Sequence, residues 1–448
     1  MPIRLAAARA GSLPIELGHV EDLSHDGRGI VRQHGKIVFI EGALPTEDVE
    51  FQIIRRRHEY DEARVLAVKT RSMQRVSPVC QHFGICGGCV LQHLAPAAQL
   101  AAKQKILFDN LERIGHLKPQ AILPPVSGPA WGYRRRARLS VRCEGSRDLV
   151  RVGFIEKNSK RITDVQRCET LHPSIGSLIG PLSALIGKLS ILERIPQIEV
   201  AVGAESSVLV LRVLSQPDIA DRKKLHEFEQ AHDVRFYLQP GTEDTAVPLS
   251  GERVRLGYSL PDWNVHINFE PADFIQVNSE INQQLVAHAI DELRIDSQHR
   301  VLDLFSGLGN FTLPIARIAK EVVGIEGESS LVNRARVNAQ CNRLSNVKYY
   351  QADLFTDQSH AVWMRQTYDR LLLDPPRTGA REILRYMDDR LPPRIVYISC
   401  HPATLARDAN YLVHERKYQL LTAGVVDMFP HTAHVESIAV FACSGSQR

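Results

Sequence analysis

The stretch VLDLFSGLGNFTLPIA, residues 301–316, decides the fold of this chain. It begins as an apolar strand, tightens at Gly307 and Gly309, and continues as a helical pattern. Glycines two positions apart allow a sharp turn and let a ligand approach the backbone closely. A strand, a glycine turn and a helix in this order predict the start of a doubly wound α/β sheet with a ligand site at the turn.

The sequence after this stretch repeats the alternation of strand and helix. The apolar runs are RVLDLF, EVVGIE, KYYQAD, RLLLDPP and RIVYISC, followed by two final strands around 418–427 and 434–443. Helical patterns separate most of these runs. The alternation predicts a mostly parallel sheet with helices on both faces.

Acidic residues stand where successive strands end: Glu326 after the second, Asp353 after the third and Asp374 after the fourth. Because the carboxyl ends of parallel strands meet at one edge of a sheet, these side chains are expected to share a cleft with the glycine turn. The turn, with Asp303 on its strand, resembles the first motif of class I S-adenosylmethionine (SAM) methyltransferases. Glu326 is then expected to bind the two ribose hydroxyls of SAM, and Asp353 the adenine edge.

Two strand ends carry groups suited to chemistry. The fourth strand ends in DPPR, residues 374–377, and the fifth ends in Ser399-Cys400. Enzymes that methylate amino groups of bases often have an aromatic residue after Asp-Pro-Pro, and RNA cytosine-C5 methyltransferases place a cysteine in this motif; Arg377 fits neither pattern. Cys400 is left with three interpretations: a packing residue, a metal ligand or a nucleophile.

A nucleophilic cysteine suits one reaction in particular. Carbon 5 of uracil is too poor a nucleophile to take a methyl group directly, but a thiolate that adds to C6 pushes electron density onto C5. The adduct must then lose its C5 proton to a general base before the thiol is eliminated. Glu436, at the start of the last strand in HTAHVESIAVF, is a carboxylate that can serve as this base.

Four strings of the catalytic half, DxFSGLGNF, DPPR, SCHPATLARD and DMFPHTAHVES, resemble the signature of RNA uracil-C5 methyltransferases. The resemblance implies that Cys400 is the nucleophile and Glu436 the base. It also implies that Gln276 spans SAM and the target uracil, and that the cofactor site is lined by Phe305, Asn310, Glu326, Asp353 and Asp374. Phe274 is a stacking surface for a nucleobase or a core residue. The target base must be flipped out or single-stranded to be attacked at C6.

The eight cysteines include a cluster, Cys80, Cys86 and Cys89, at spacings of five and two residues. The family pattern supplies Cys168 as a fourth ligand, and four thiolates suit zinc or an iron–sulfur cluster. The uneven spacing resembles the [4Fe-4S] sites of ribosomal-RNA members of the family, so we expect an iron–sulfur cluster that is structural or supports RNA binding and is not redox-active in catalysis. The spacing differs from the Cys-x3-Cys-x2-Cys of radical-SAM enzymes. The remaining cysteines, at 143, 341 and 443, are expected to pack as small apolar residues.

The N-terminal half is predicted to be rich in β-strands. Short runs with glycine turns over residues 15–70 predict a small OB-type barrel that resembles an RNA-binding TRAM domain, with an SH3-like or purely structural barrel as the alternative. A helical pattern covers residues 96–115, and residues 131–260 are β-rich with one helical insert around 174–193. The expected domains are a TRAM domain over 12–70, a central β-rich domain with the iron–sulfur site over 71–265, and the methyltransferase domain over 266–448.

Charge and composition point to a nucleic-acid partner and away from a membrane. The net charge is only +4, but residues 51–75 carry seven Lys/Arg against three acids, and WGYRRRARLSVR, residues 131–142, carries five arginines and no acid. No apolar run approaches the roughly 18 to 20 residues that span a bilayer. The N-terminus, MPIRLAAARAGSLP, reads as a frayed tail without a signal peptide. A cytoplasmic protein is therefore expected, and a monomer because nothing in the sequence suggests an oligomer.

A barrel together with a cysteine cluster resembles the branch of the family that methylates 23S ribosomal RNA at a uracil-1939-type site. Alternatives within the family are a second 23S rRNA branch, which has a shorter N-terminus, and tRNA enzymes, which lack both features. An alternative of another class is a non-catalytic RNA-binding assembly factor. The intact set of Cys400, Glu436, Gln276 and Asp374 argues against that alternative.

Overall fold

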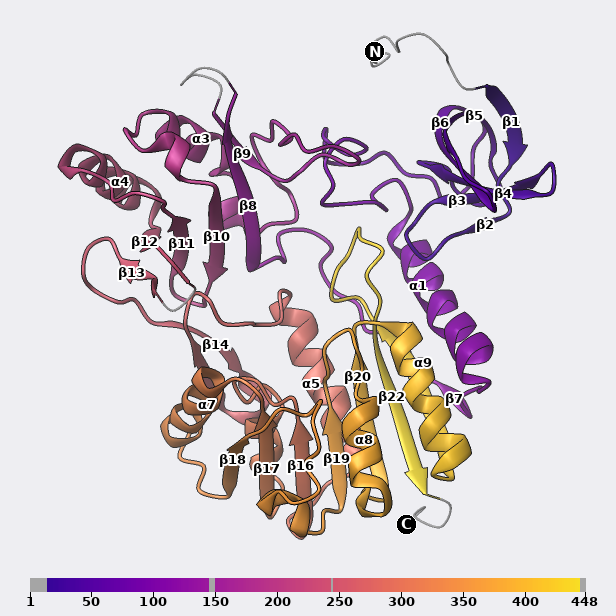
Figure 1. Ribbon diagram of the computed structural model, residues 1–448, viewed down its shortest axis with the longest axis vertical. Coiled ribbons are helices and arrows are strands. Elements are labelled where there is room, and N and C mark those ends of the chain that lie inside the picture. Colours follow the sequence, from indigo (N-terminus) through magenta and orange to yellow (C-terminus); the bar gives the residue numbers. More distant parts are fainter. Residues whose placement is uncertain (1–13, 145–149, 243–244, 444–448) are drawn as a thin grey trace. The chain divides into compact units, whose positions relative to one another are not determined.

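A computed structural model describes residues 14–144, 150–242 and 245–443 of the chain (Figure 1). Its contacts divide the chain into two compact units, residues 1–102 with 431–433, and residues 103–430 with 434–448. The expected N-terminal tail lies, up to residue 13, outside the described residues. Within the described ranges, no helix has the length and apolar character needed to cross a membrane.

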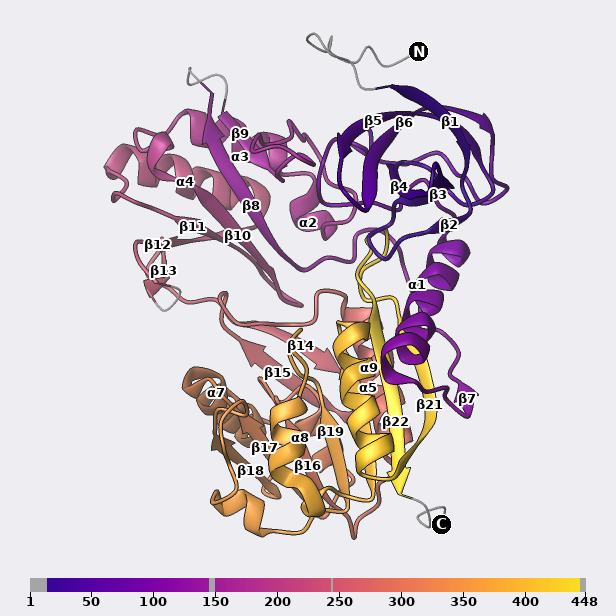
Figure 2. The ribbon, with the colours of Figure 1, turned by 45° about the vertical axis from the view of Figure 1, so that its right-hand side comes forward.

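The first unit contains one six-stranded sheet. Its strands are β1 (Ile15–His19), β2 (Asp22–Leu23), β3 (Gly29–Gln33), β4 (Lys36–Glu41), β5 (Asp48–Arg56) and β6 (Tyr60–Thr70), in the order β1-β5-β6-β4-β3-β2. The consecutive short strands β1 and β2 pair with β5 and β3 at opposite ends of this order, so the sheet curls back on itself (Figure 2). Every second residue of β5, namely Val49, Phe51 and Ile53, is buried inside.

Helix α1 (Pro96–Asn110) follows the cysteine segment and continues as a wider helical turn, Leu111–Gly115. Leu107 and Leu111 are buried in the same apolar cluster as Leu405 and Leu412 of the C-terminal sequence. The C-terminal part of the expected 96–115 helix therefore packs on the methyltransferase sheet.

The second unit begins with another six-stranded sheet, in the order β13-β12-β11-β10-β8-β9. Its strands are β8 (Arg136–Cys143), β9 (Val150–Gly153), β10 (Gln197–Val202), β11 (Ser207–Arg212), β12 (Arg235–Gln239) and β13 (Val247–Pro248). The expected helical insert is α2 (Pro173–Gly176) and α3 (Ile179–Gly187).

The prediction of a single helical insert in this region is wrong, because α4 (Ile219–His232) is a second one. Asp218 caps it by accepting a hydrogen bond from the backbone N–H of Asp221, and its apolar contacts with the sheet come from Leu225 and Phe228. The charged residues between them hide the apolar stripe in the sequence.

The C-terminal sheet has the predicted, mostly parallel architecture. Its order is β18-β17-β16-β19-β20-β22-β21-β7, and the first five strands in this order run parallel. The strands are β16 (Arg300–Leu304), β17 (Glu321–Glu326), β18 (Val347–Gln351), β19 (Arg370–Leu373), β20 (Arg394–Ser399), β21 (Tyr418–Val426) and β22 (Glu436–Cys443). The two-residue strand β7 (Ala121–Ile122) joins the edge and was not predicted, because two exposed residues carry no periodic signal.

Helices cover both faces of this sheet, and residues along each strand alternate between them. Val301 and Leu302, for example, belong to different apolar clusters. One face packs against α5 (Ser279–Leu293), α6 (Thr312–Ala316) and α7 (Ser329–Cys341), and the other against α8 (Arg381–Met387) and α9 (Pro402–Asn410). Figure 1 shows α8 and α9 in front of the sheet and α5 behind it. The parallel strands consequently present all their carboxyl ends at one edge.

Candidate active site

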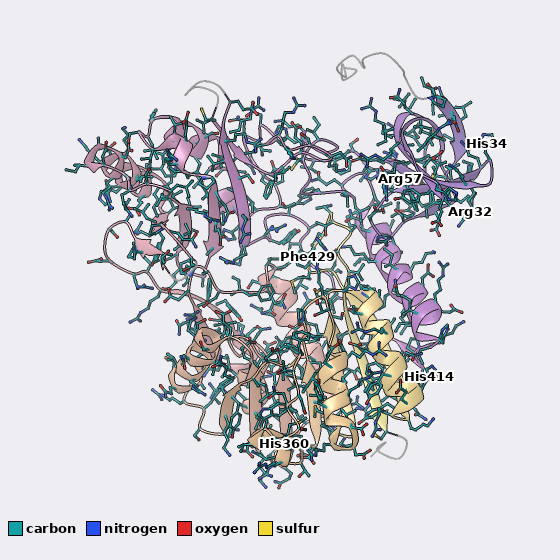
Figure 3. All side chains as sticks on the ribbon, viewed as in Figure 1. Arg32, His34, Arg57, His360, His414 and Phe429 are labelled. Atoms are coloured by element: carbon teal, nitrogen blue, oxygen red, sulfur yellow. The ribbon has the colours of Figure 1, made fainter. Side chains whose placement is uncertain are left out.

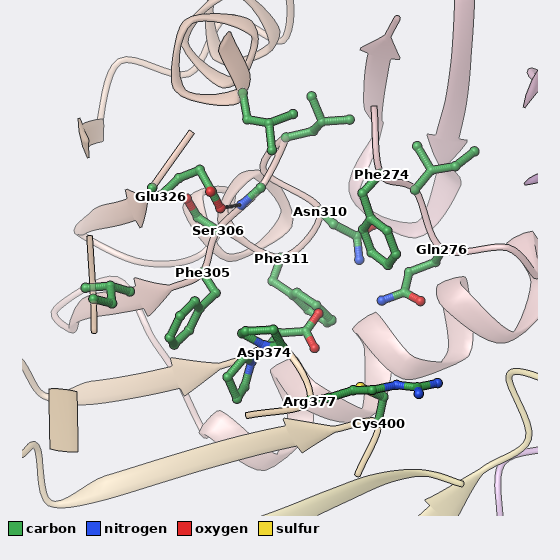
Figure 4. Close-up of a pocket in the computed structure, with 18 of the residues that line it drawn as sticks. Phe274, Gln276, Phe305, Ser306, Asn310, Phe311, Glu326, Asp374, Arg377 and Cys400 are labelled. Carbon is green, nitrogen blue, oxygen red and sulfur yellow. Dashed lines mark hydrogen bonds between the residues drawn. The ribbon is translucent and has the colours of Figure 1, made fainter. Parts of the chain in front are cut away.

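A cavity of about 940 Å³ opens at the carboxyl edge of the C-terminal sheet, within the second unit (Figure 4). Its walls come from the ends of five parallel strands, the start of β22 and the segment before α5. All eight predicted catalytic and cofactor residues line it: Gln276, Phe305, Asn310, Glu326, Asp353, Asp374, Cys400 and Glu436. The structure thus brings together side chains that are up to 160 positions apart in the sequence (436 minus 276).

The turn after β16 forms the floor of the cavity. Phe305, Gly307 and Gly309 all have positive φ angles, of 65°, 53° and 96°. A Cβ added at Gly309 would come within 2.6 Å of the Tyr349 hydroxyl, whereas Gly307 faces open space. Glycine is therefore required at one position for packing, and at the other it leaves backbone exposed to a ligand.

Glu326, the last residue of the neighbouring strand β17, is hydrogen-bonded to this turn. Its Oε2 accepts a hydrogen bond of 3.0 Å from the Gly307 N–H, and its Oε1 accepts one of 3.0 Å from the Glu328 N–H. The first of these bonds is the dashed line in Figure 4. The carboxylate keeps further lone pairs for hydroxyl groups of a ligand.

Asn310 is held by two side chains from different elements. Its Oδ1 accepts hydrogen bonds from the Tyr258 hydroxyl (2.9 Å) and from Asn282 Nδ2 (2.8 Å), and its Nδ2 donates to Asn282 Oδ1 (2.9 Å). Tyr258 lies on β14 (Leu256–Leu260), which pairs with β15 (Val265–Phe269), and Asn282 lies on α5. Neither partner was predicted, because the contacts span 28 and 52 positions and neither residue lies in a motif.

Phe274 and Gln276 enter the cavity from the segment between β15 and α5 (Figure 4). Phe274 is 70% exposed, which excludes the alternative that it is a core residue. The segment is anchored by Arg136, whose guanidinium donates to the backbone carbonyls of Pro271 and Ala272, and by the ion pair of Asp273 with Arg334. An exposed ring on an anchored segment is suited to stack on a flat ligand.

Cys400 and Glu436 face each other across two paired strands. The residue before Cys400, Ser399, pairs with Ser437, the residue after Glu436, so the antiparallel register sets the thiol and the carboxyl side by side. Ser437 Oγ also donates to the Ser399 carbonyl at 3.1 Å. Helix α9 begins two residues after Cys400, and a helix N-terminus favours a thiolate.

Burial and neighbouring negative charges favour the protonated forms of Cys400 and Glu436. Burial, reinforced by the charges of Glu436 and Asp374, raises the pKa of Cys400 from 9.0 to about 11, and the positive charge of Arg377 opposes the rise. Burial also raises the pKa of Asp374 to about 7, and burial with the charge of Asp374 raises the pKa of Glu436 well above its ordinary value. A thiol and carboxyls of this kind are set to exchange a proton when a reacting group arrives.

Comparison with known proteins identifies the family. A family model described as tRNA (Uracil-5-)-methyltransferase matches residues 96–442. The chain belongs to this family.

Curated relatives span nearly the whole chain. One from Xanthomonas campestris pv. campestris (strain 8004), named 23S rRNA (uracil(1939)-C(5))-methyltransferase RlmD, is 51% identical over 425 residues, which are 94% of this chain and 96% of the relative. One of the same name from Stenotrophomonas maltophilia (strain R551-3) is 51% identical over 423 residues, 94% and 95% of the two chains.

A solved structure, that of Pyrococcus abyssi tRNA (uracil-54, C5)-methyltransferase in complex with S-adenosyl-L-homocysteine, has the same fold. Its TM-score is 0.71 at 23% identity, with 95% of this chain and 100% of that chain covered.

The cavity of this uracil-C5 methyltransferase also contains Arg377 and His434, two residues for which the sequence predicted no role. Arg377 Nη2 lies 3.1 Å from His434 Nδ1, and both side chains line the cavity with Cys400. Burial and the charges of Arg377, Lys103 and Arg134 lower the pKa of His434, so its ring is neutral and can accept a hydrogen bond from Arg377. His434 stands in HTAHVES, so only its place inside a motif could have pointed to it.

The sequence predicted that the arginines of residues 131–142 together bind a polyphosphate. In the structure several of them instead make contacts within the protein. Arg135 Nη1 donates to the Gly203 carbonyl and Arg136 anchors the Phe274 segment. Arg138 pairs with Glu199 at 3.0 Å while 63% of its side chain stays exposed. Arg134 lines the cavity. Part of the stripe is structural, because the guanidinium groups of Arg135 and Arg136 satisfy backbone carbonyls of neighbouring segments.

The predicted cluster ligands Cys80, Cys86 and Cys89 belong to the first unit and Cys168 to the second, all in the described part of the chain. There, no group of three or more His, Cys, Asp or Glu side chains is arranged to hold a metal ion. Cys86 Sγ accepts a hydrogen bond of 3.4 Å from the Gly88 N–H, and the Cys80 N–H donates to Gln92 Oε1 at 3.2 Å. Cys168, in the other unit, lies 3.3 Å from Thr170 Oγ1.

Proposed function

We propose that this enzyme transfers a methyl group from SAM to carbon 5 of a uridine in 23S ribosomal RNA, the reaction named in its two relatives. The observation that carries the proposal is that Cys400 and Glu436 lie next to the paired residues Ser399 and Ser437 of two adjacent strands, inside one cavity with the glycine turn. A nucleophile and a base side by side are what methylation at C5 of uracil requires and what methylation of an amine does not.

The proposed reaction begins with the Cys400 thiolate, which forms a bond to C6 of the uracil while the C5–C6 double bond opens toward O4 as an enolate. C5 then takes the methyl group that SAM supplies, and S-adenosylhomocysteine leaves. Glu436 removes the proton from C5, the C5–C6 double bond re-forms and the C6–S bond breaks, which returns the thiolate. The raised pKa of Glu436 makes its carboxylate a stronger base than an exposed glutamate.

The features of the cavity fit SAM, which carries no phosphate but has ribose hydroxyls, an amino acid end and an adenine ring. Glu326 offers a carboxylate at the glycine turn, and Asp353, whose Oδ1 accepts from the Phe355 N–H, offers another at the next strand end. The Phe305 ring lies 5.9 Å from that of Phe355, which supplies an apolar wall. Asn310, Asp374 and Gln276 complete the proposed site, with Gln276 between SAM and the target base.

The first sheet is proposed to be an OB-like TRAM barrel that binds RNA. Its parallel pair β4–β6, within an otherwise antiparallel sheet, supports an OB-type arrangement. Arg55, Arg56 and Arg57 end β5 or follow it with 59%, 56% and 46% of their side chains exposed, and their ion pairs are 3.9 to 4.0 Å long. Figure 3 labels Arg57 and Arg32 at the surface of this unit. Exposed arginines of this kind bind phosphates.

The cysteines are proposed to hold a [4Fe-4S] cluster, with Cys80, Cys86 and Cys89 from the N-terminal motif and Cys168 as the fourth ligand. The support is the four-thiolate donor set and the family pattern, together with the N–H···S bond to Cys86, a type of contact that tunes iron–sulfur clusters. No catalytic step is assigned to the cluster.

The remaining proposals concern organisation. The domains are proposed as residues 12–70, 71–265 and 266–448, although contacts in the structure group both later sheets into one unit. The enzyme is proposed to act as a cytoplasmic monomer on a uridine flipped out of the RNA.

The test uses RNA in which 5-fluorouridine replaces uridine. With SAM, the full-length enzyme is expected to form a gel-stable covalent complex, because fluorine at C5 blocks the elimination step. Cys400→Ala is expected to form none while binding SAM and RNA within a few-fold of wild type. A wild-type protein that binds the RNA but forms no complex would establish a non-catalytic binding factor. Mapping 5-methyluridine in 23S rRNA and tRNA from cells lacking the protein identifies the substrate.

A further inference from the structure

The loop between β21 and β22, residues 427–435, leads directly to Glu436. Phe429 and His434 of this loop line the cavity, and Figure 3 labels Phe429 on it. Residues 431–433 in its middle group with the first unit, while the residues on either side belong to the second. The position of Glu436 therefore depends on how this loop is held.

Lys103, on α1, holds the beginning of the loop. Its ammonium group donates to Asp427 Oδ1 at 2.6 Å and to the Phe429 carbonyl at 2.9 Å, with 1% of the side chain exposed. Burial lowers the pKa of Lys103, and the charge of Asp427 opposes the change. A buried ammonium persists only where its partners compensate the lost hydration, so the loop cannot shift at Asp427 or Phe429 without leaving a buried charge unpaired.

Gln99, one turn earlier on the same helix, holds the middle of the loop. Its Oε1 accepts a hydrogen bond of 2.9 Å from the His431 N–H, and its Nε2 lies 3.2 Å from His431 Nδ1. The same Nε2 donates to the carbonyls of Leu91 (3.0 Å) and Leu94 (2.8 Å). The N–H groups of Val90 and Leu91 donate in turn to the His431 carbonyl. The side chain of Gln99 is 1% exposed.

We propose that Gln99 and Lys103 are positioning residues that set the loop carrying Glu436, and that Gln99 links this loop to the segment that follows Cys89. The inference rests on the proposed function. Apolar side chains at both positions would bury the same helix face, so what the two polar residues add is a defined position of the loop. Cys400 stands on a different strand and does not depend on the loop, so the proton abstraction by Glu436 is the step that these residues govern.

The test compares Lys103→Met and Gln99→Leu with Lys105→Met, a control on the same helix whose lysine pairs at the surface with Asp109. SAM affinity and covalent trapping on 5-fluorouridine RNA are expected within about threefold of wild type for all three, because neither measurement needs the base. Turnover on uridine RNA is expected to fall about 10- to 100-fold in Lys103→Met and Gln99→Leu, the effect of displacing a catalytic group by about 1 Å. The methylated covalent adduct should accumulate in both, and not in the control.

Two results would overturn the inference. Turnover without adduct in Lys103→Met and Gln99→Leu, at the rate of the control, means that the loop is positioned without them. A parallel loss of SAM affinity, trapping and melting temperature means that the two residues are structural only. Wild-type enzyme in the same assay separates the proposals, because its failure to trap 5-fluorouridine RNA rejects the proposed function itself.

Discussion

The charges around Cys400 predict that two substitutions move its reactivity in opposite directions. Glu436 raises the pKa of the thiol and Arg377 lowers it. Glu436→Gln removes a negative charge and keeps the size of the side chain, so the thiolate becomes easier to form. Arg377→Met removes the opposing positive charge, so the thiolate becomes harder to form.

The expected size of the change in reactivity follows from the raised pKa of Cys400. With a pKa of about 11 in place of 9.0, about one thiol in a thousand is ionised at pH 8, against about one in ten. Burial is the largest cause and remains in both variants, so neither substitution restores the ordinary value. A single nearby charge changes the thiolate fraction by about tenfold. Since a less basic thiolate is also a weaker nucleophile, the net change in alkylation rate is about threefold in each direction.

The assay is alkylation of the enzyme by iodoacetamide between pH 7 and 9.5, with Cys400 quantified by mass spectrometry and the exposed Cys341 as internal reference. The rate at Cys400 is expected to rise in Glu436→Gln, to fall in Arg377→Met, and to be unchanged in both at Cys341. Because the pKa of Glu436 is itself raised, its charge develops only as the pH rises, so the gain in Glu436→Gln should grow with pH. Shifts of the same sign in both variants would refute the electrostatic reasoning.

Three further predictions concern other steps and sites. Glu436→Gln on uridine RNA is expected to accumulate a methylated covalent adduct visible on a denaturing gel, and rapid turnover would assign the base to another group. Asp303 is completely buried, and burial raises its pKa to about 7. The stability that its protonated carboxyl contributes is therefore present below about pH 4 and is lost as the pH rises through 7. By pH 8 the free energy of unfolding of Asp303→Asn should exceed that of wild type by on the order of 4 kcal/mol, measured by denaturant unfolding at several pH values. Metal analysis of wild-type protein purified without oxygen should find about four iron atoms per chain, and the Cys86→Ser variant should contain fewer. Wild-type protein that contains no iron and still methylates normally would contradict the proposed cluster.

The edge of the catalytic sheet was predictable because parallel strands carry a strict geometric rule. Once Val301–Leu304 was recognised as a strand, the residues that follow each later strand had to share its carboxyl edge, and Glu326, Asp374 and Cys400 do. Glu436 was predicted for a different reason, because the reaction needs a general base and the string HTAHVES supplies a carboxylate that the family resemblance also indicates. The structure adds that β22 runs antiparallel to β20, which puts the start of β22 at the same edge as the end of β20.

The parts that escaped prediction depend on contacts that no local pattern encodes. Lys103 meets Asp427 across 324 positions, and in the sequence it is one of several lysines in a helical pattern. Arg136 stands among arginines that suggest RNA binding, yet its guanidinium is directed to two backbone carbonyls more than 130 positions away. In both cases the side chain type is typical of a surface, and only the packed structure shows that it satisfies buried polar groups.

Cys400 and Glu436 are held in position in different ways because of the topology of the sheet. Cys400 directly follows β20, whose six residues are all buried, so its position is set by the sheet. Glu436 begins β22, and everything before it is loop, so the sheet alone holds it on one side only. The buried hydrogen bonds that Lys103 donates to Asp427 and that Gln99 accepts from His431 hold the loop on the side that the sheet leaves free. Substitutions at Gln99 or Lys103 should accordingly affect release of the methylated product more than the initial attack on the base.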